Sequence, residues 1–472
     1  MNLTRRSMLQ APVAALGAWQ AAAPAGRIKP RPSKAISASP LSIGFETLDR
    51  EGFDPARTYS HIAESGVKWA RCQTGWCRSE KRKGQYDFAW LDGVVDSLRA
   101  AGVQPWFNLG YGNVLYTPGA PLPTAVGFAP VFSEEARAGW LSYVRAMAEH
   151  YRGRVTHWEI WNEPNLGGFW RPNKPNPPDY VDLVKITGPL IRKIVPGAVI
   201  VGGGFARIPY RFIEDCLRAG MAQYIDKVSY HPYRPQPELN YASEIHALRG
   251  LLDRYKPGIG LWQGENGAPS TAAKDSAGAL SQLAWTETAQ AKWLLRRLLS
   301  DLSLGIEVTS YFLIVDLVNY FTRPENAGRT NYKGILRGGD YTRKPSYHAF
   351  QNLCALFDSR TVRSDFAVQV EGGASPLEDM LVHSASFVRD GRALYAFWYP
   401  ADLQQEYTAR RARIRVWSGG AASISEPVFV DLLSGEIRRP AVAQQAADGF
   451  WVFDNVEVRD YPVLIADAGV VL

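Results

Sequence analysis

Short β-rich runs alternate with longer amphipathic stretches from Pro40 to about Ala355, and this alternation constrains the fold of the 472-residue chain more than any other feature. It predicts parallel strands joined by helical crossovers. The expected strands are 41–46, 67–72, 103–109, 156–162, 198–203, 227–231, 259–265 and 307–314. Eight strands, each followed by a helix, over roughly 250 residues or somewhat more have the size of a (β/α)8 barrel.

Helical periodicity fills the spaces between these runs, and glycines stand where several of the helices should end. The clearest expected helices are 55–65, 88–101, 134–151, 180–195 and 286–304. The glycines that should cap them in the left-handed conformation are Gly66, Gly102, Gly153, Gly197 and Gly305. An open doubly wound sheet fits the same alternation, but no G-x-G-x-x-G phosphate loop follows an early strand. We therefore expect an α/β fold with a closed TIM barrel.

After Asp358 the pattern changes to short alternating runs separated by Gly, Pro and Asp. This pattern is typical of antiparallel β-structure. We expect a β-sandwich appended to the barrel, with a strand from residues 30–40 covering one of its edges. The predicted domains are a signal peptide and linker at 1–30, the barrel at 31–357 and the β-sandwich at 358–472.

The first residues have the build of an export signal. Arg5 and Arg6 precede an apolar segment from Ala11 to Ala23 and small residues around it. This order predicts a signal peptide, and the arginine pair is similar to a twin-arginine signal. The alternative is a disordered basic tail. We expect a periplasmic or extracellular protein, and export leaves open a disulfide between Cys72 and Cys77.

Composition and spacing argue against several classes of protein. An apolar share of 46% supports a large core, and after the N-terminus charged residues interrupt every apolar stretch before it could span a bilayer. The net charge of +7 comes partly from the leader and partly from scattered arginines, so we expect no nucleic-acid partner. Histidines and cysteines lack metal-binding spacing, so we expect no metal and no cofactor. The oligomeric state is left open.

Two similar runs end the fourth and seventh expected strands in an acid. They are Trp158-Glu159-Ile160-Trp161-Asn162-Glu163-Pro164-Asn165 and Gly260-Leu261-Trp262-Gln263-Gly264-Glu265-Asn266-Gly267. In a (β/α)8 barrel the functional groups gather at the C-terminal ends of the strands. The polar residues at those ends are Glu46, Arg71, Asn108, Asn162, Glu163, His231, Tyr233, Glu265 and Tyr311. Paired carboxylates among hydrogen-bonding groups suit a carbohydrate substrate.

Residues in the loops above the strands complete the candidate site. Trp76, Tyr111, Trp170 and Tyr320 could stack on sugar rings or belong to the core. Asp316 could bond sugar hydroxyls, although a loop at that point is polar in any case.

Trp-Asn-Glu-Pro at 161–164 and Gly-Glu-Asn-Gly at 264–267 resemble clan A glycoside hydrolases, with family 39 the most similar. The resemblance covers about 41–355. It implies a retaining O-glycosyl hydrolase that cleaves β-glycosidic bonds of a poly- or oligosaccharide, with Glu163 as general acid/base and Glu265 as nucleophile. It also implies that Arg71 and Tyr233 hold Glu265 ionised. Retention requires the two carboxylates to lie roughly 5 Å apart.

Each assignment has an alternative. Glu163 and Glu265 could be turn carboxylates, Arg71 could pair with a structural acid, and His231 could be a structural histidine. The chain could also be a catalytically inactive carbohydrate-binding barrel in cell-envelope or exopolysaccharide assembly. The presence of both glutamates favours the interpretation as an enzyme, because an inactive carbohydrate-binding barrel has no need to keep both.

Overall fold

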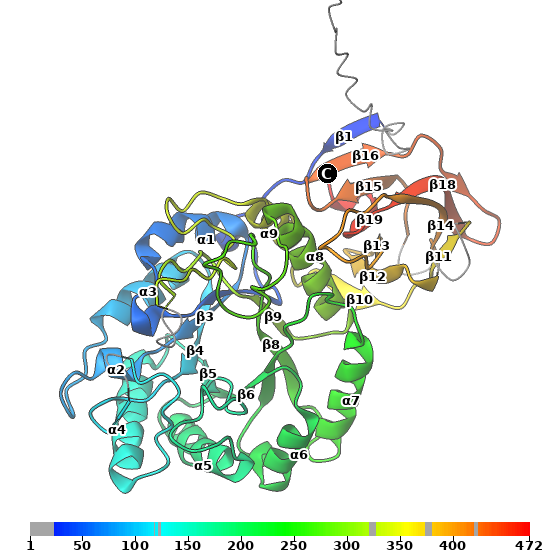
Figure 1. Cartoon of the computed structure of the whole chain (residues 1–472). Coiled ribbons are helices and arrows are strands. Elements are labelled where there is room, and N and C mark those ends of the chain that lie inside the picture. The colour runs from blue at the N-terminus through cyan, green and yellow to red at the C-terminus, as the bar shows by residue number, and fades with distance from the viewer. Residues whose placement is uncertain (1–22, 118, 121–123, 321–326, 373–379, 420–422) are drawn as a thin grey trace, which may run out of the picture.

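The computed structural model describes residues 23–117, 119–120, 124–320, 327–372, 380–419 and 423–472 (Figure 1). Its centre is a closed barrel of parallel strands in chain order. The strands are β2 (Leu41–Phe45), β3 (Trp69–Gln73), β4 (Gln104–Leu109), β5 (His157–Ile160), β6 (Val199–Ala206), β7 (Lys227–His231), β8 (Gly260–Asn266) and β9 (Val308–Tyr311). Pairing of β9 with β2 closes the barrel, which excludes the open sheet and confirms the predicted fold class.

Helices surround the barrel, as Figure 1 shows. They are α1 (Tyr59–Ser65), α2 (Trp76–Ser79), α3 (Ala89–Ala100), α4 (Glu134–Tyr151), α5 (Pro177–Ile194), α6 (Tyr210–Arg218), α7 (Tyr241–Asp253), α8 (Glu287–Ser303) and α9 (Pro345–Leu356). The five glycines expected at helix ends all adopt φ between 64° and 85°. Each glycine turns the chain from the helix toward the next strand with a positive φ, a backbone conformation that is strained for residues with a side chain.

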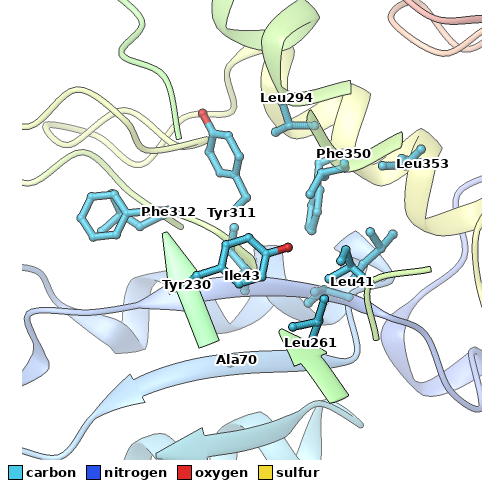
Figure 2. Close-up of a cluster of buried hydrophobic side chains, with 14 of the residues drawn as sticks. Leu41, Ile43, Ala70, Tyr230, Leu261, Leu294, Tyr311, Phe312, Phe350 and Leu353 are labelled. Carbon is cyan, nitrogen blue, oxygen red and sulfur yellow. The ribbon is translucent and has the colours of Figure 1, made fainter. Parts of the chain in front are cut away.

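Apolar residues pack both outside and inside the barrel. Outside, side chains of β2 and β9 meet Leu294 of α8 and Phe350 and Leu353 of α9 (Figure 2). Inside, Trp69, Trp106 and Trp262 pack with Val201 and Val308 to form a dry floor. This floor supports the polar residues that lie nearer the C-terminal ends of the strands.

The C-terminal region forms two antiparallel sheets, ordered β1-β16-β15-β19-β13-β12-β10 and β11-β14-β18-β17. The strands are β10 (Thr361–Ser364), β11 (Val368–Glu371), β12 (His383–Arg389), β13 (Arg392–Trp398), β14 (Arg410–Trp417), β15 (Pro427–Asp431), β16 (Glu436–Arg439), β17 (Gln444–Gln445), β18 (Phe450–Val458) and β19 (Val463–Asp467). The edge strand expected at 30–40 is instead β1 (Ala23–Arg27), which pairs with β16. Residues Ser33–Ala35 form a 3-10 turn.

Two further expectations can be compared with the described residues. Cys72, Cys77, Cys216 and Cys354 are buried and lie outside disulfides, so Cys72 and Cys77 are not joined by a disulfide. No helix within the described part of the chain has the length and apolar character to cross a bilayer.

Candidate active site

A cavity of about 810 Å³ opens at the C-terminal end of the barrel. Its walls include groups from the ends of several strands, among them Glu46, Asn162, Glu163, His231 and Glu265. The side chains of Glu163 and Glu265 are 12% and 13% exposed, so both carboxylates reach the cavity while most of their surface is shielded.

Glu163 stands on a strained turn directly after β5. Trp161 and Glu163 have φ of 70° and 49°, in the left-handed region that side chains disfavour. The N–H of Glu163 donates to the carbonyl of Gly204 at 2.8 Å, and the amide of Asn165 both accepts from and donates to the backbone of Ala206. The end of β6 therefore clamps the turn and keeps Glu163 aimed at the cavity.

Glu265 lies near the end of β8, beside a register shift between Gln263 and Asn266. Arg71 Nη1 donates to Glu265 Oε2 at 2.8 Å, and the Tyr233 hydroxyl donates to Oε1 at 2.8 Å. Each carboxylate oxygen thus accepts one hydrogen bond from the protein. Both bonds favour the ionised carboxylate.

Glu163 and Glu265 face each other across His231. A carboxylate oxygen of each, together with an imidazole nitrogen of His231, lie within 4.8 Å of one another. His231 Nδ1 is 3.2 Å from Glu163 Oε1 and 3.9 Å from Glu265 Oε2. Such a trio can also ligate a metal, so the expectation of a metal-free site stays a prediction.

Arg71 is fully buried and each of its five N–H donors has an acceptor. Two go to Glu159, one each to Glu46 and Glu265, and one to the Asn162 Oδ1. Because a guanidinium only donates, this last bond identifies the Asn162 atom facing Arg71 as the carbonyl oxygen. The NH2 group of Asn162 can then donate to another acceptor. Asn108 donates to Glu159 and to the carbonyl of Trp161, so it supports the site from behind the cavity wall.

Burial changes the protonation of three groups around this cluster. It raises the pKa of Glu46 to about 8, with the charge of Glu265 adding to the rise and Arg71 opposing it. It lowers the pKa of His231 to about 4, which leaves the imidazole neutral at neutral pH. It lowers the pKa of Lys333, which lines the cavity, to about 7, although Glu265 and Asp316 oppose the fall.

The structure brings some of the predicted loop residues to the cavity and places others in the core. Tyr111 and Tyr320 line the cavity. Trp76 is buried and donates to Glu80, and Trp170 packs against Trp161 in the core. Trp76 in α2 and Trp170 in the 166–172 loop both point into the core. The prediction that these two tryptophans stack on sugar is therefore corrected.

Tyr311 and Asp316 are corrected in the same way. Tyr311 donates to the carbonyl of Ala268 and sits among apolar side chains outside the barrel (Figure 2). Asp316 is buried, pairs with Lys344 at 2.7 Å and accepts from the N–H of Gly334. Neither side chain lines the cavity. Tyr311 holds the segment after β8, and Asp316 holds the segments after β9.

Sequence reasoning missed Glu159, Lys333 and Gln73. Glu159 had a signal, because it lies between the outward apolar residues Trp158 and Ile160 and must therefore point into the barrel. Gln73 ends β3, where it accepts from Arg50 and the Thr47 N–H and donates to the Tyr111 hydroxyl. Lys333 stands in an irregular segment after β9, where the sequence carries no periodic pattern to place it.

Comparison with known proteins finds a family with a related sequence. Residues 51–251 match the model of the glycosyl hydrolases family 39. The chain is similar to family 39 glycoside hydrolases. The predicted resemblance to retaining glycosidases of clan A is thereby confirmed, and with it the expected kinship to O-glycosyl hydrolases.

Individual relatives extend the comparison. A β-xylosidase of Geobacillus stearothermophilus is 26% identical over 197 residues, which are 36% of this chain and 36% of that protein. A family 39 glycoside hydrolase of the gut symbiont Bacteroides cellulosilyticus WH2 superposes with a TM-score of 0.66 at 21% identity, over 91% of this chain and 81% of that one. A monomeric β-xylosidase of Caulobacter crescentus CB15 gives 0.58 at 19% identity, over 93% and 97%. At these identities the two structures show a shared fold.

Proposed function

We propose that this protein is a retaining β-glycosidase of a poly- or oligosaccharide, with Glu163 as general acid/base and Glu265 as nucleophile. One observation carries the proposal. Carboxylate oxygens of the two residues lie within 4.8 Å across one cavity, close to the roughly 5 Å that double displacement requires.

The contacts of each carboxylate suit its role. Glu265 accepts from Arg71 and Tyr233, which favour the anion that attacks the anomeric carbon. Glu163 Oε1 lies 3.2 Å from the neutral imidazole of His231, and a neutral neighbour is compatible with a protonated acid. In the first step Glu163 protonates the leaving oxygen as Glu265 forms the glycosyl ester. In the second step Glu163 takes a proton from the water that cleaves this ester.

The surroundings of Asn162 support a contact with a substrate hydroxyl. It lines the cavity beside Glu163, and Arg71 occupies its carbonyl oxygen, so its NH2 group faces the space where a sugar would lie. We propose that it donates to the sugar 2-hydroxyl, where hydrogen bonds strengthen as the oxocarbenium ion develops. Tyr111 and Tyr320, on the same cavity, would contact the sugar rings.

The test is hydrolysis of a panel of p-nitrophenyl β-glycosides, beginning with the xyloside because of the β-xylosidase relatives. Glu163→Gln and Glu265→Gln should each lose activity by about a thousandfold or more while the far-ultraviolet circular dichroism is unchanged. Glu80→Gln, a buried glutamate of the barrel outside the cavity, is the matched control. Unchanged rates in either active-site variant would overturn the assignment.

Export to the periplasm or beyond is a second part of the proposal. It rests on the twin arginines and apolar segment of residues 1–22, which lie outside the described residues. Fractionation of cells with Arg5→Lys/Arg6→Lys and wild-type chains tests it. Equal export of both chains would contradict a twin-arginine route.

A further inference from the structure

Three buried polar atoms face one point inside the barrel, beside Gly264 of β8. They are Ser229 Oγ, Glu159 Oε1 and His231 Nε2, none of which has a hydrogen-bond partner among the described residues. A Cβ added to Gly264 would lie 2.2 Å from Ser229 Oγ and 3.3 Å from each of the other two atoms. Because buried polar atoms almost always have partners, their convergence marks a binding point for a small polar molecule.

Two glycines leave this point without a side chain of their own. Gly264 carries no side chain where the three atoms meet, and a Cβ on Gly204, at the end of β6, would lie 3.3 Å from the same Glu159 oxygen. Ser229 and His231 are two residues apart on β7, so their side chains point to the same side of the strand. A water bound at such a point would have the two to four polar partners that buried waters usually have.

His231 connects this point to the proposed acid. Its Nδ1 faces Glu163 at 3.2 Å and Glu265 at 3.9 Å, whereas its Nε2 faces Glu159 and Ser229. Burial keeps the ring neutral at neutral pH, so only one of its nitrogens carries a proton. The charged groups that act on the ring are Glu265, Arg71 and Glu159.

The contacts of Glu159 decide which nitrogen that is. Its Oε2 accepts two bonds from Arg71 and one from Asn108, the pattern of a carboxylate, which leaves Oε1 as an acceptor only. An acceptor on the Nε2 side favours the proton on Nε2. The Nδ1 lone pair then faces Glu163.

We propose that a buried water at Gly264 bridges Ser229, Glu159 and the Nε2–H of His231, and that Ser229 and Glu159 thereby hold the tautomer whose Nδ1 accepts a hydrogen bond from protonated Glu163. Both are positioning residues, and the inference rests on the proposed acid role of Glu163. The lone pair stabilises the acid before the first step. Once Glu163 has lost its proton, the same lone pair disfavours the carboxylate and favours its reprotonation from water in the second step.

The first experiment compares Ser229→Ala with Ser310→Ala, a matched control because Ser310 is a buried serine of β9 whose hydroxyl also lacks a described partner. For an alkyl β-glycoside, which needs an acid, kcat/KM of Ser229→Ala should fall about tenfold. For the 2,4-dinitrophenyl glycoside, whose leaving group needs none, it should stay within about twofold. Equal loss on both substrates, or no loss on either, would overturn the positioning role.

The second experiment reads the tautomer directly and needs no substrate. Nitrogen-15 NMR of the histidine-labelled full chain at pH 7, assigned with His231→Gln, should show the proton of His231 on Nε2 in the wild type. Glu159→Gln can donate to Nε2, so this variant should move the proton of His231 to Nδ1. Ser229→Ala is the second variant, for use if Glu159→Gln does not fold, and it should show both tautomers. A wild-type proton on Nδ1 refutes the inference, whereas inactivity on every glycoside would instead refute the proposed function.

Discussion

A single arginine connects three carboxylates at the base of the cavity. Arg71 bonds three glutamates and one asparagine, and its guanidinium lies 5.5 Å from the ring of Trp106 in the dry floor. One positive charge cannot neutralise three carboxylates that are largely buried. Protonation of Glu46, whose pKa burial raises to about 8, removes one of the two surplus negative charges.

Glu46→Gln should change how stability depends on pH. The unfolded chain ionises Glu46 near pH 4.5, whereas the folded protein keeps its proton until about pH 8. Wild-type stability conferred by this group is therefore complete below pH 4.5 and is lost as the pH rises to 8. Urea unfolding should show the variant gaining stability relative to wild type between pH 5 and pH 8.5. A difference that is the same at both pH values would contradict a raised pKa.

At the scale of the elements, the end of β6 aims the proposed acid. Gly203 and Gly204 have φ of 106° and 54°, and the strand shifts register between Gly202 and Phe205. The shift presents the carbonyl of Gly204 to the N–H of Glu163. A Cβ on Gly203 would approach the backbone oxygen of Ser229 to 2.5 Å, so no other residue fits.

Gly203→Ala should therefore destabilise the protein more than a glycine substitution in open space. Gly258→Ala is the control, because Gly258 also has positive φ but nothing within 4 Å of its added Cβ. The control should lower the free energy of unfolding by about 1–2 kcal/mol because of backbone strain. Gly203→Ala should lower it by about 1–3 kcal/mol more because of overpacking. Equal losses in thermal or urea unfolding would show that the close approach is absent.

These elements also show what the sequence could predict. All eight strands and the five capping glycines follow from periodicity and glycine position, because barrel strands and helix ends are local features. Glu163 and Glu265 could be predicted as site residues because the functional residues of barrels lie at the C-terminal ends of the strands. Trp76, Trp170, Tyr311 and Asp316 were misplaced because the direction of a side chain at the end of a strand or in the segment after it depends on tertiary packing that no local pattern encodes.

At the scale of the whole molecule, a buried ion pair joins the barrel to the β-sheets. Arg296 of α8 donates two bonds to Glu238 at 2.7 and 2.6 Å, and a third to the carbonyl of Ala401. Trp398 of β13 donates to the same glutamate at 2.6 Å. The N-terminal segment adds β1 to the outer edge of the larger sheet (Figure 1).

Arg296→Met should destabilise the molecule by about 3–5 kcal/mol, because it leaves Glu238 buried without its cation. Arg296→Met/Glu238→Gln should restore most of this loss, since the glutamine can still accept from Trp398 without a charge. Differential scanning calorimetry measures both. If the double variant is as unstable as the single one, packing and not charge dominates this contact.

The most direct measurement is covalent trapping of the nucleophile. The 2-deoxy-2-fluoro analogue of whichever aryl β-glycoside the wild type hydrolyses should inactivate it, and peptide mass spectrometry should find the sugar on Glu265. Glu163→Gln should still be labelled when the leaving group is dinitrophenol, because that step needs no acid. A label on Glu46, Glu159 or any other residue, or turnover without a trapped ester, would contradict the account.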